Sequence, residues 1–361
     1  MSETQKKLYP FKFKPAEFEK SYGKEKWSAA DLGFADSEIE NGWLSGNSMS
    51  DVMETYLERV VGENVYQFYG RQFPVFIKFI NLDGRTPLFV HPDDVVAMER
   101  YDALGRAKLL YIQNASKDSK LYIGFKREVS ATEFFEKCLD GSIYELMNEV
   151  VPVEGSHYFI EPGTVHAAAG KISMVCVSES SDANFVMHDD YATDEERMLQ
   201  TTQISECLDY VNLGKFDLKK LSAHQAEGVV DTLIERPEFN VSKLDLKDPL
   251  HIYTDKFESF IIYVCVRGEA SVQVPTETEN GQKVMENYVL SEDEAILVPA
   301  ELPDFYLTAR QVDTKLLEVV TRPMEALDEY IDPSTEPYLE GEDYGGVEDM
   351  DSEDEEEDDE D

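Results

Sequence analysis

The pattern of hydrophobic and polar residues predicts a chain built mainly from β-strands. Stretches rich in β-branched and aromatic residues recur in both halves and are bounded by glycine, proline and polar residues, as strands are. In the first half we expect strands over residues 72–82, 86–90, 109–113, 120–125 and 172–178. A tight turn at Asp83-Gly84 is expected to join the first two.

Helical spacing of apolar residues interrupts this pattern in the first half only. It predicts helices over residues 49–61, 94–103, 131–141 and 143–151, and a further helical portion within 193–210. Ser50 and Ser130 are expected N-caps, and Gly141 is expected to end the third helix.

Residues 211–325 contain strand after strand without a long helix. The expected strands are 239–246, 259–267, 270–275, 286–290, 295–299 and 315–320. Short strands at regular spacing favour a closed barrel or jelly roll. We therefore predict two tandem β-barrels, the first over residues 1–210 with helical insertions and the second over 211–330. A disordered acidic tail is expected over 331–361.

Residues 155–190 carry the candidate chemistry. They are typical of a strand, a tight turn at 161–163, His166 just past the turn, and a second strand. A histidine delivered by a strand–turn–strand unit into the mouth of a β-barrel is a common way to build a metal or ligand site. His166 is therefore the first candidate site residue.

The charge pattern excludes one class of partner. The formal net charge is −42, and fourteen of the acidic residues lie within 341–361, so the rest of the chain is still strongly acidic. A surface that binds nucleic acid is basic, so no nucleic-acid partner is expected. A phosphorylated ligand would need a locally basic pocket. The tail is interpreted as a solubilising appendage or as an element that binds a protein partner, which the sequence does not identify.

The cysteines and the absence of long apolar runs indicate a cytoplasmic protein. The four cysteines stand far apart, which predicts buried free thiols rather than disulfides or a zinc knuckle. The first residues do not resemble a signal peptide, and no apolar run reaches the roughly 18 residues needed to span a bilayer. No membrane partner is expected.

A series of motifs resembles the class I mannose-6-phosphate isomerases, also called phosphomannose isomerases. It comprises segments 40–52 and 73–82, HPDD at 91–94, GTVHA at 163–167, Ser181-Asp182 before a helix, and segment 292–303. The likeness covers about residues 8–320. It implies two cupin domains, which are jelly-roll barrels, a zinc site, and interconversion of mannose 6-phosphate and fructose 6-phosphate.

The residues at the implied metal site depart from the family pattern. By the resemblance, His91 and His166 are retained ligands, whereas Phe89 stands in place of a glutamine and Lys108 in place of a glutamate. Val186 stands where the family has an arginine. Two histidines are fewer than the three or four ligands that zinc takes, so a weakened or metal-free site is expected. The alternative is a relocated zinc site that draws on nearby residues: Asp93, His157, Cys176, Glu179 or His188.

Three basic residues are candidates for the chemistry that a metal would otherwise supply. Lys108 is predicted to face a sugar oxygen as a positive charge in place of the metal, with Arg106 beside it, and the alternative for each is a solvated surface position. Lys78 lies in an otherwise apolar strand and must reach either the barrel lumen or solvent. The lumen is the better prediction, with Lys78 and Arg106 binding substrate.

Three functions remain open on these observations. The resemblance implies an isomerase of carbohydrate metabolism that acts on a sugar phosphate, and its zinc-dependent activity is expected to be weakened or lost. A bicupin that binds a sugar or sugar phosphate without catalysis is the second hypothesis. A structural or interaction protein is the third.

Overall fold

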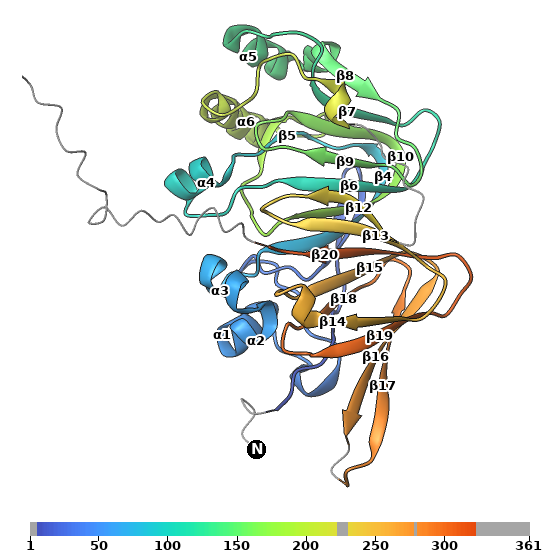
Figure 1. Cartoon of the computed structure of the whole chain (residues 1–361). Helices are drawn as coiled ribbons and strands as arrows, with labels where there is room; N and C mark the ends of the chain where they lie inside the picture. The colour runs from blue at the N-terminus through green and yellow to red at the C-terminus, as the bar shows by residue number, and fades with distance from the viewer. Residues whose placement is uncertain (1–5, 222–229, 278–279, 323–361) are drawn as a thin grey trace, which may run out of the picture. The chain divides into compact units, whose positions relative to one another are not determined.

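The computed structural model describes residues 6–221, 230–277 and 280–322 (Figure 1). Its strands form three antiparallel sheets, of ten, six and four strands. The prediction of a mainly β chain is confirmed. Within the described part of the chain, no helix is long and apolar enough to cross a membrane.

Strand β10 (His166–Glu179) is the centre of the ten-stranded sheet. Along one edge it pairs with β4 (Val75–Arg85) and β5 (Leu88–Val90), and along the other with β6 (Lys108–Ala115) and β7 (Lys120–Phe125). The two partners on each edge lie end to end, and the sheet as a whole is curled. The other strands are β2 (Ala16–Lys20), β3 (Gly23–Ser28), β8 (Met147–Val150), β9 (His157–Ile160) and β11 (Phe185–His188).

The predicted turn at Asp83-Gly84 is wrong, because β4 continues through these residues. Asp83 pairs with Lys171 and Gly84 with Gly170, so the ladder to β10 outweighs the local turn preference. A Cβ atom on Gly84 would lie 3.3 Å from the Cα atom of Tyr22, so glycine here permits close backbone approach. Strand β5 then continues along the same edge of β10 in the same direction, with Phe89 opposite His166.

Most predicted helices of the first half are present. They are α1 (Met49–Tyr56), α2 (Glu58–Val61), α4 (Asp94–Tyr101), α5 (Ala131–Asp140) and α6 (Asp194–Cys207). Helix α3 (Glu63–Tyr69) was not predicted. The side chain of Ser130 accepts a hydrogen bond from the backbone N–H of Glu133 and caps α5, as predicted. Gly141 ends this helix with a φ of 79°, a conformation that glycine adopts at little cost.

Two helix predictions need correction. Ser48, not Ser50, caps α1 and forms a capping box with Asp51. The helix predicted over 143–151 is instead a short 3-10 turn (Ser142–Leu146) followed by β8, whose residues pair with β7. Cross-strand pairing there outweighs the helical spacing of the apolar residues.

The second half contributes the two smaller sheets. The six-stranded sheet consists of β1 (Phe11–Lys12), β12 (Val230–Glu235), β13 (Asn240–Leu246), β15 (Ile261–Arg267), β18 (Ala295–Val298) and β20 (Thr314–Val320). The four-stranded sheet consists of β14 (Leu250–Tyr253), β16 (Glu269–Glu277), β17 (Lys283–Ser291) and β19 (Asp304–Ala309). All six strands predicted for this half are present. The sequence pattern missed β12, β14 and β19, in which most positions are half-buried or exposed.

The two halves share one hydrophobic core. Strand β1, from the N-terminal segment, pairs with β18, and the Phe73 and Phe260 rings lie 4.6 Å apart between centroids. The described residues up to Arg322 belong to one compact unit. The boundary at residues 210/211 therefore remains a prediction, and the predicted tail, residues 331–361, lies outside the described residues.

Candidate functional site

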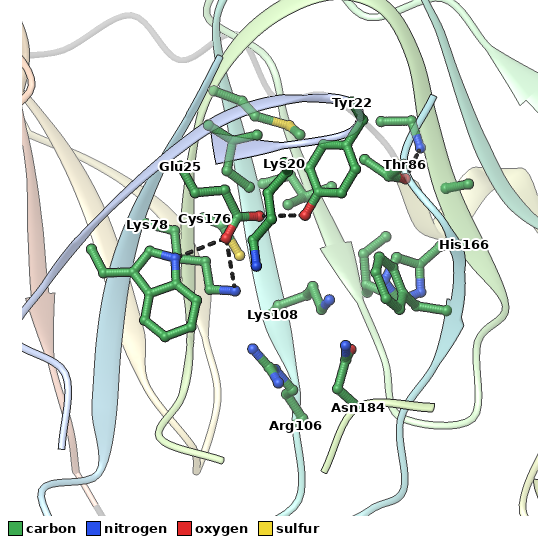
Figure 2. A pocket seen from close by; sticks show the side chains of 18 of the residues that line it. Lys20, Tyr22, Glu25, Lys78, Thr86, Arg106, Lys108, His166, Cys176 and Asn184 are labelled. Atoms are coloured by element: carbon green, nitrogen blue, oxygen red, sulfur yellow. Dashed lines mark hydrogen bonds and ion pairs between the residues drawn. The ribbon is translucent and has the colours of Figure 1, made fainter. Parts of the chain in front are cut away.

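A cavity of about 310 Å³ lies within the curl of the ten-stranded sheet. Four basic side chains converge on it from three strands, namely Lys20 of β2, Lys78 of β4, and Arg106 and Lys108 at the start of β6 (Figure 2). His166 faces them across the same space. This is a local concentration of positive charge in a strongly acidic chain. From the sequence we inferred that a phosphorylated ligand would need such a pocket, but not where it lies.

Lys108 and Arg106 are buried, so the solvated alternative considered for each is wrong. Lys108 is 9% exposed and Arg106 is 7% exposed, and both line the cavity. Burial, together with the charges of Arg106 and Lys78 and against the opposing effect of Cys176, lowers the pKa of Lys108 to about 7. Burial also lowers the pKa of Arg106, which keeps its charge because its ordinary value is so high. The cavity thus holds one permanent cation beside an amine that titrates near neutral pH.

Lys78 reaches the barrel lumen, where a hydrogen-bonded carboxylate holds it. Its Nζ lies 3.5 Å from Oε2 of Glu25 and 4.4 Å from the centroid of the Trp27 ring. Tyr22 donates a hydrogen bond to Oε1 of Glu25 at 2.9 Å, and the Trp27 indole donates to Oε2 at 2.8 Å. Burial opposes ionisation of Glu25, but the charge of Lys78 and these two donors outweigh it and lower its pKa. Burial lowers the pKa of Lys78 to about 8.

Replacing Glu25 with glutamine is expected to weaken anion binding in the cavity about tenfold, because it removes the charge that keeps Lys78 protonated and placed. The measurement is the affinity for inorganic phosphate by calorimetry near neutral pH. Glu19→Gln is the matched control, since Glu19 lies in the neighbouring strand and pairs with Lys24 at the exposed surface. Equal weakening in both variants would contradict a specific role for Glu25 in placing Lys78.

His91 and His166 lie next to each other, with 5.2 Å between their ring centroids. Nδ1 of His91 is 3.1 Å from the Ala183 carbonyl, and Nδ1 of His166 is 2.8 Å from the Thr164 carbonyl, so each Nδ1 carries the proton. Each Nε2 is buried without a hydrogen-bond partner and is an acceptor. Burial and the charge of Lys108 lower the pKa of both histidines well below the ordinary value. Both imidazoles are therefore neutral.

These residues do not fit a zinc ion. Two imidazole acceptors are available, but the centroid of the Phe89 ring lies 6.0 Å from that of His91 and 6.2 Å from that of His166. Nζ of Lys108 lies 5.7 Å from the Phe89 centroid. An apolar ring and buried cations at these positions disfavour a divalent ion. Among the residues that the structure describes, no group of three His, Cys, Asp or Glu side chains is placed to hold a metal.

Most of the residues considered as alternative zinc ligands make other contacts. Asp93 caps α4, Glu179 accepts a hydrogen bond from the Ala107 backbone, and His188 contacts the Cys138 carbonyl and Asp190. Cys176 lines the cavity, and the four cysteines are free and buried as predicted. No relocated set of ligands is assembled around His91 and His166 from these residues.

Sequence reasoning missed the wall formed by β2, β3 and the residues after them. Lys20, Tyr22, Glu25 and Trp27 all line the cavity, although no strand was predicted in this segment. The segment from Tyr22 to Trp27 is too short and too polar for its sequence pattern to indicate a strand that faces the lumen. Val186 lies in β11 opposite Phe89 and is not among the residues that line the cavity.

Comparison with known proteins gives a consistent set of relatives, although no family model matches the chain. Mannose-6-phosphate isomerase ManA of Bacillus subtilis is 23% identical, over 78% of this chain and 85% of its own length. The putative mannose-6-phosphate isomerase YvyI of the same organism is 22% identical, over 74% and 81%. This chain is a divergent homologue of the mannose-6-phosphate isomerases.

Solved structures of mannose-6-phosphate isomerases share its fold. The B. subtilis enzyme superimposes with a TM-score of 0.69 at 19% identity, covering 86% of this chain and 99% of the other. A zinc-bound mannose 6-phosphate isomerase gives a TM-score of 0.65 at 15% identity, covering 87% and 99%. The cupin architecture implied by the motifs is confirmed. At this identity the likeness shows the fold alone.

Proposed function

We propose that this isomerase homologue binds a hexose 6-phosphate in the cation-lined cavity and interconverts its aldose and ketose forms without zinc. The observation that carries the proposal is the meeting of Lys78, Arg106, Lys108 and His166 in one buried cavity. The relatives are named for mannose 6-phosphate, so mannose 6-phosphate and fructose 6-phosphate are the first pair to test.

The charge of the cavity selects an anionic ligand. Lys20, Lys78, Arg106 and Lys108 exceed the two carboxylates in the lining, Glu25 and Asp182. A phosphate group would relieve the mutual repulsion of the buried cations, so binding is favoured although the chain as a whole is acidic. The cavity lies near the small end of the range for small-molecule sites, which suits a single phosphorylated sugar.

The isomerisation requires one proton to move between adjacent carbons. In the proposed step the neutral amine of Lys108 takes the proton from C2 of the aldose, and the C1 carbonyl oxygen becomes an enediolate oxygen. The guanidinium of Arg106 stabilises that charge. Lys108 then returns its proton to C1 while the proton on O2 passes to O1, which leaves the C2 carbonyl of the ketose. Nε2 of His166 accepts a hydrogen bond from a hydroxyl of the open-chain sugar and orients C1 and C2.

Turnover is expected to follow a bell-shaped pH profile. Lys108 accepts a proton only when neutral, so kcat/KM should rise as the pH passes its pKa of about 7. Lys78 loses its charge above its pKa of about 8, so phosphate binding should weaken and kcat/KM should fall. The measurement is kcat/KM across this pH range. A continued rise well above the pKa of Lys78 would contradict its proposed role, and a flat profile would contradict that of Lys108.

A coupled assay on mannose 6-phosphate tests the function itself. Protein treated with a chelator should form fructose 6-phosphate at the same rate as protein supplied with zinc. Turnover that requires zinc and is lost in His166→Ala would contradict the proposal. Thermal stabilisation by mannose 6-phosphate without any turnover would instead support a sugar-phosphate-binding protein, the second candidate, which Val186 in place of the family arginine favours.

A further inference from the structure

A second hollow lies outside the ten-stranded sheet, beside the four-stranded one. Segments 7–9 and 42–43 form one wall, segments 274–277 and 283–288 of the β16–β17 hairpin form the other, and segment 302–306 closes one end. We call this hollow the hairpin groove. Its volume of about 820 Å³ exceeds that of the cation-lined cavity, so it suits a longer ligand. It shares no lining residue with that cavity.

Four aromatic side chains line the hairpin groove. Tyr9 stacks on Tyr288 across the groove with 6.4 Å between centroids and 13° between planes, and Trp43 packs edge-on against Tyr9 at 6.0 Å. Tyr306 lies at the end of the groove. Trp43, Tyr288 and Tyr306 are half-buried, so part of each ring remains accessible. Rings of this kind offer flat apolar faces next to polar groups.

A hydrogen-bonded cluster holds the end of the groove in place. His251 Nε2 lies 2.6 Å from Oδ2 of Asp304, and Tyr253 donates to His251 Nδ1 at 3.1 Å. The His251 ring stacks on Tyr306 at 4.1 Å between centroids and 14° between planes. These contacts fix one carboxylate and one aromatic ring before any ligand arrives, which lowers the entropic cost of binding. A fixed carboxylate has several acceptor positions, so it can serve a ligand hydroxyl as well as His251.

The charges that line the groove nearly balance. Lys7 and Lys283 face Glu277, Glu286 and Asp304, in contrast to the excess of cations in the inner cavity. A phosphorylated ligand or a nucleic acid gains little from such a lining. A neutral ligand with many hydroxyl groups and apolar C–H faces matches it: carboxylates and amines bind the hydroxyls, and aromatic rings cover the C–H faces.

A peptide is a poorer match than a sugar chain. Peptides that bind along a sheet use free backbone N–H and C=O groups. Within the groove wall, β16 pairs with β17 over 269–277, so the backbone groups on that edge are already used, whereas β19 pairs with its other edge only over 270–273. A saccharide needs only the side-chain groups that the wall presents.

We propose that the hairpin groove binds a neutral oligosaccharide, stacked against Trp43 and Tyr306 and hydrogen-bonded to Asp304. This site is separate from the cation-lined cavity and does not depend on turnover there. It gives the second half of the chain a binding role of its own.

Tryptophan fluorescence provides the test, since Trp27 and Trp43 are the only tryptophans of the chain. In a Trp27→Phe protein, Trp43 becomes the sole reporter. Mannopentaose, maltopentaose and cellopentaose are titrated in turn, and at least one should give a saturable change. Tyr306→Ala should weaken that binding about tenfold, the usual scale for loss of a stacked ring, and Asp304→Asn should weaken it by a smaller factor with little effect on folding. Val312→Ala, at a fully exposed site outside the groove, should leave it unchanged.

Two results would overturn the proposal. One is the absence of saturable binding by all three pentasaccharides at millimolar concentration, or binding of a polyproline peptide in their place. The other is binding that Tyr306→Ala and Asp304→Asn leave unaltered while each variant keeps the melting temperature of the parent. Calorimetry with the full chain repeats the measurement without relying on Trp43.

Discussion

Replacing Lys108 with methionine is expected to lower kcat for hexose 6-phosphate isomerisation by about a thousandfold, with a much smaller change in KM. Methionine keeps the length and the apolar stem of the side chain but has no amine to carry the proton between C2 and C1. General-base groups typically contribute factors of about 10²–10⁴, and Lys108 also adds positive charge near the enediolate. The measurement is steady-state kinetics of the chelated protein.

Lys78→Met is the matched control for this variant. Lys78 is half-buried in the cavity wall and has a lowered pKa, but Glu25 holds it and its proposed role is to bind phosphate. It should raise KM and leave kcat near that of the parent. If Lys108→Met keeps more than about a tenth of the parent kcat, Lys108 is not the base.

The stability of Lys108→Met gives an independent check. Burial holds the pKa of Lys108 at about 7, well below its unfolded value, so the unfolded chain binds more protons than the folded one. The parent is therefore destabilised below about pH 7, and this cost disappears as the pH rises towards the unfolded pKa near 10.4. Lys108→Met should be more stable by an amount on the order of a few kcal/mol at neutral pH and should match the parent at high pH. Lost activity together with increased stability is typical of a functional residue.

Much of the fold could be predicted because its signals are local and strong. The apolar run in β4, the cap at Ser130 and the glycine at Gly141 each agree with their tertiary surroundings. The errors arose where non-local pairing decides the outcome. The residues of β8 have helical spacing but pair with β7, and Gly84 lies inside a strand because β10 pairs along it.

The candidate site was only partly predictable for the same reason. His91 and His166 were found from their motifs, and Lys78 from its position in an apolar strand. The state of Lys108 was left open, because its burial depends on pairing with Ser178 of β10 and Ile160 of β9, far away in sequence. Glu25 carried no signal at all, since a polar residue in a short hairpin is usually solvated. Its role becomes visible only when β3, which carries Glu25, pairs with β4.

Restoring the family's ligands at two positions should convert the cavity into a zinc site. The rings of His91, His166 and Phe89 lie 5.2–6.2 Å apart, and Nζ of Lys108 lies 5.7 Å from Phe89. A metal about 2.1 Å from each Nε2 would therefore be within reach of side chains at all four positions. In Phe89→Gln/Lys108→Glu, one zinc ion per chain is expected by metal analysis after dialysis. The parent should retain none through these histidines.

The thermal shift of the double variant provides a large and separate readout. Zinc binds only the folded chain through this site, so at a free concentration a thousandfold above its dissociation constant it should stabilise the variant by about 4 kcal/mol. Each single variant should gain much less, because one still carries the buried ammonium and the other still carries the apolar ring. Adding His166→Ala to the double variant should abolish the gain. Stoichiometric zinc in the unmodified protein, lost on replacing either histidine, would instead show that Lys108 yields its proton and joins the histidines as a ligand. The zinc-free account of the cavity would then be wrong.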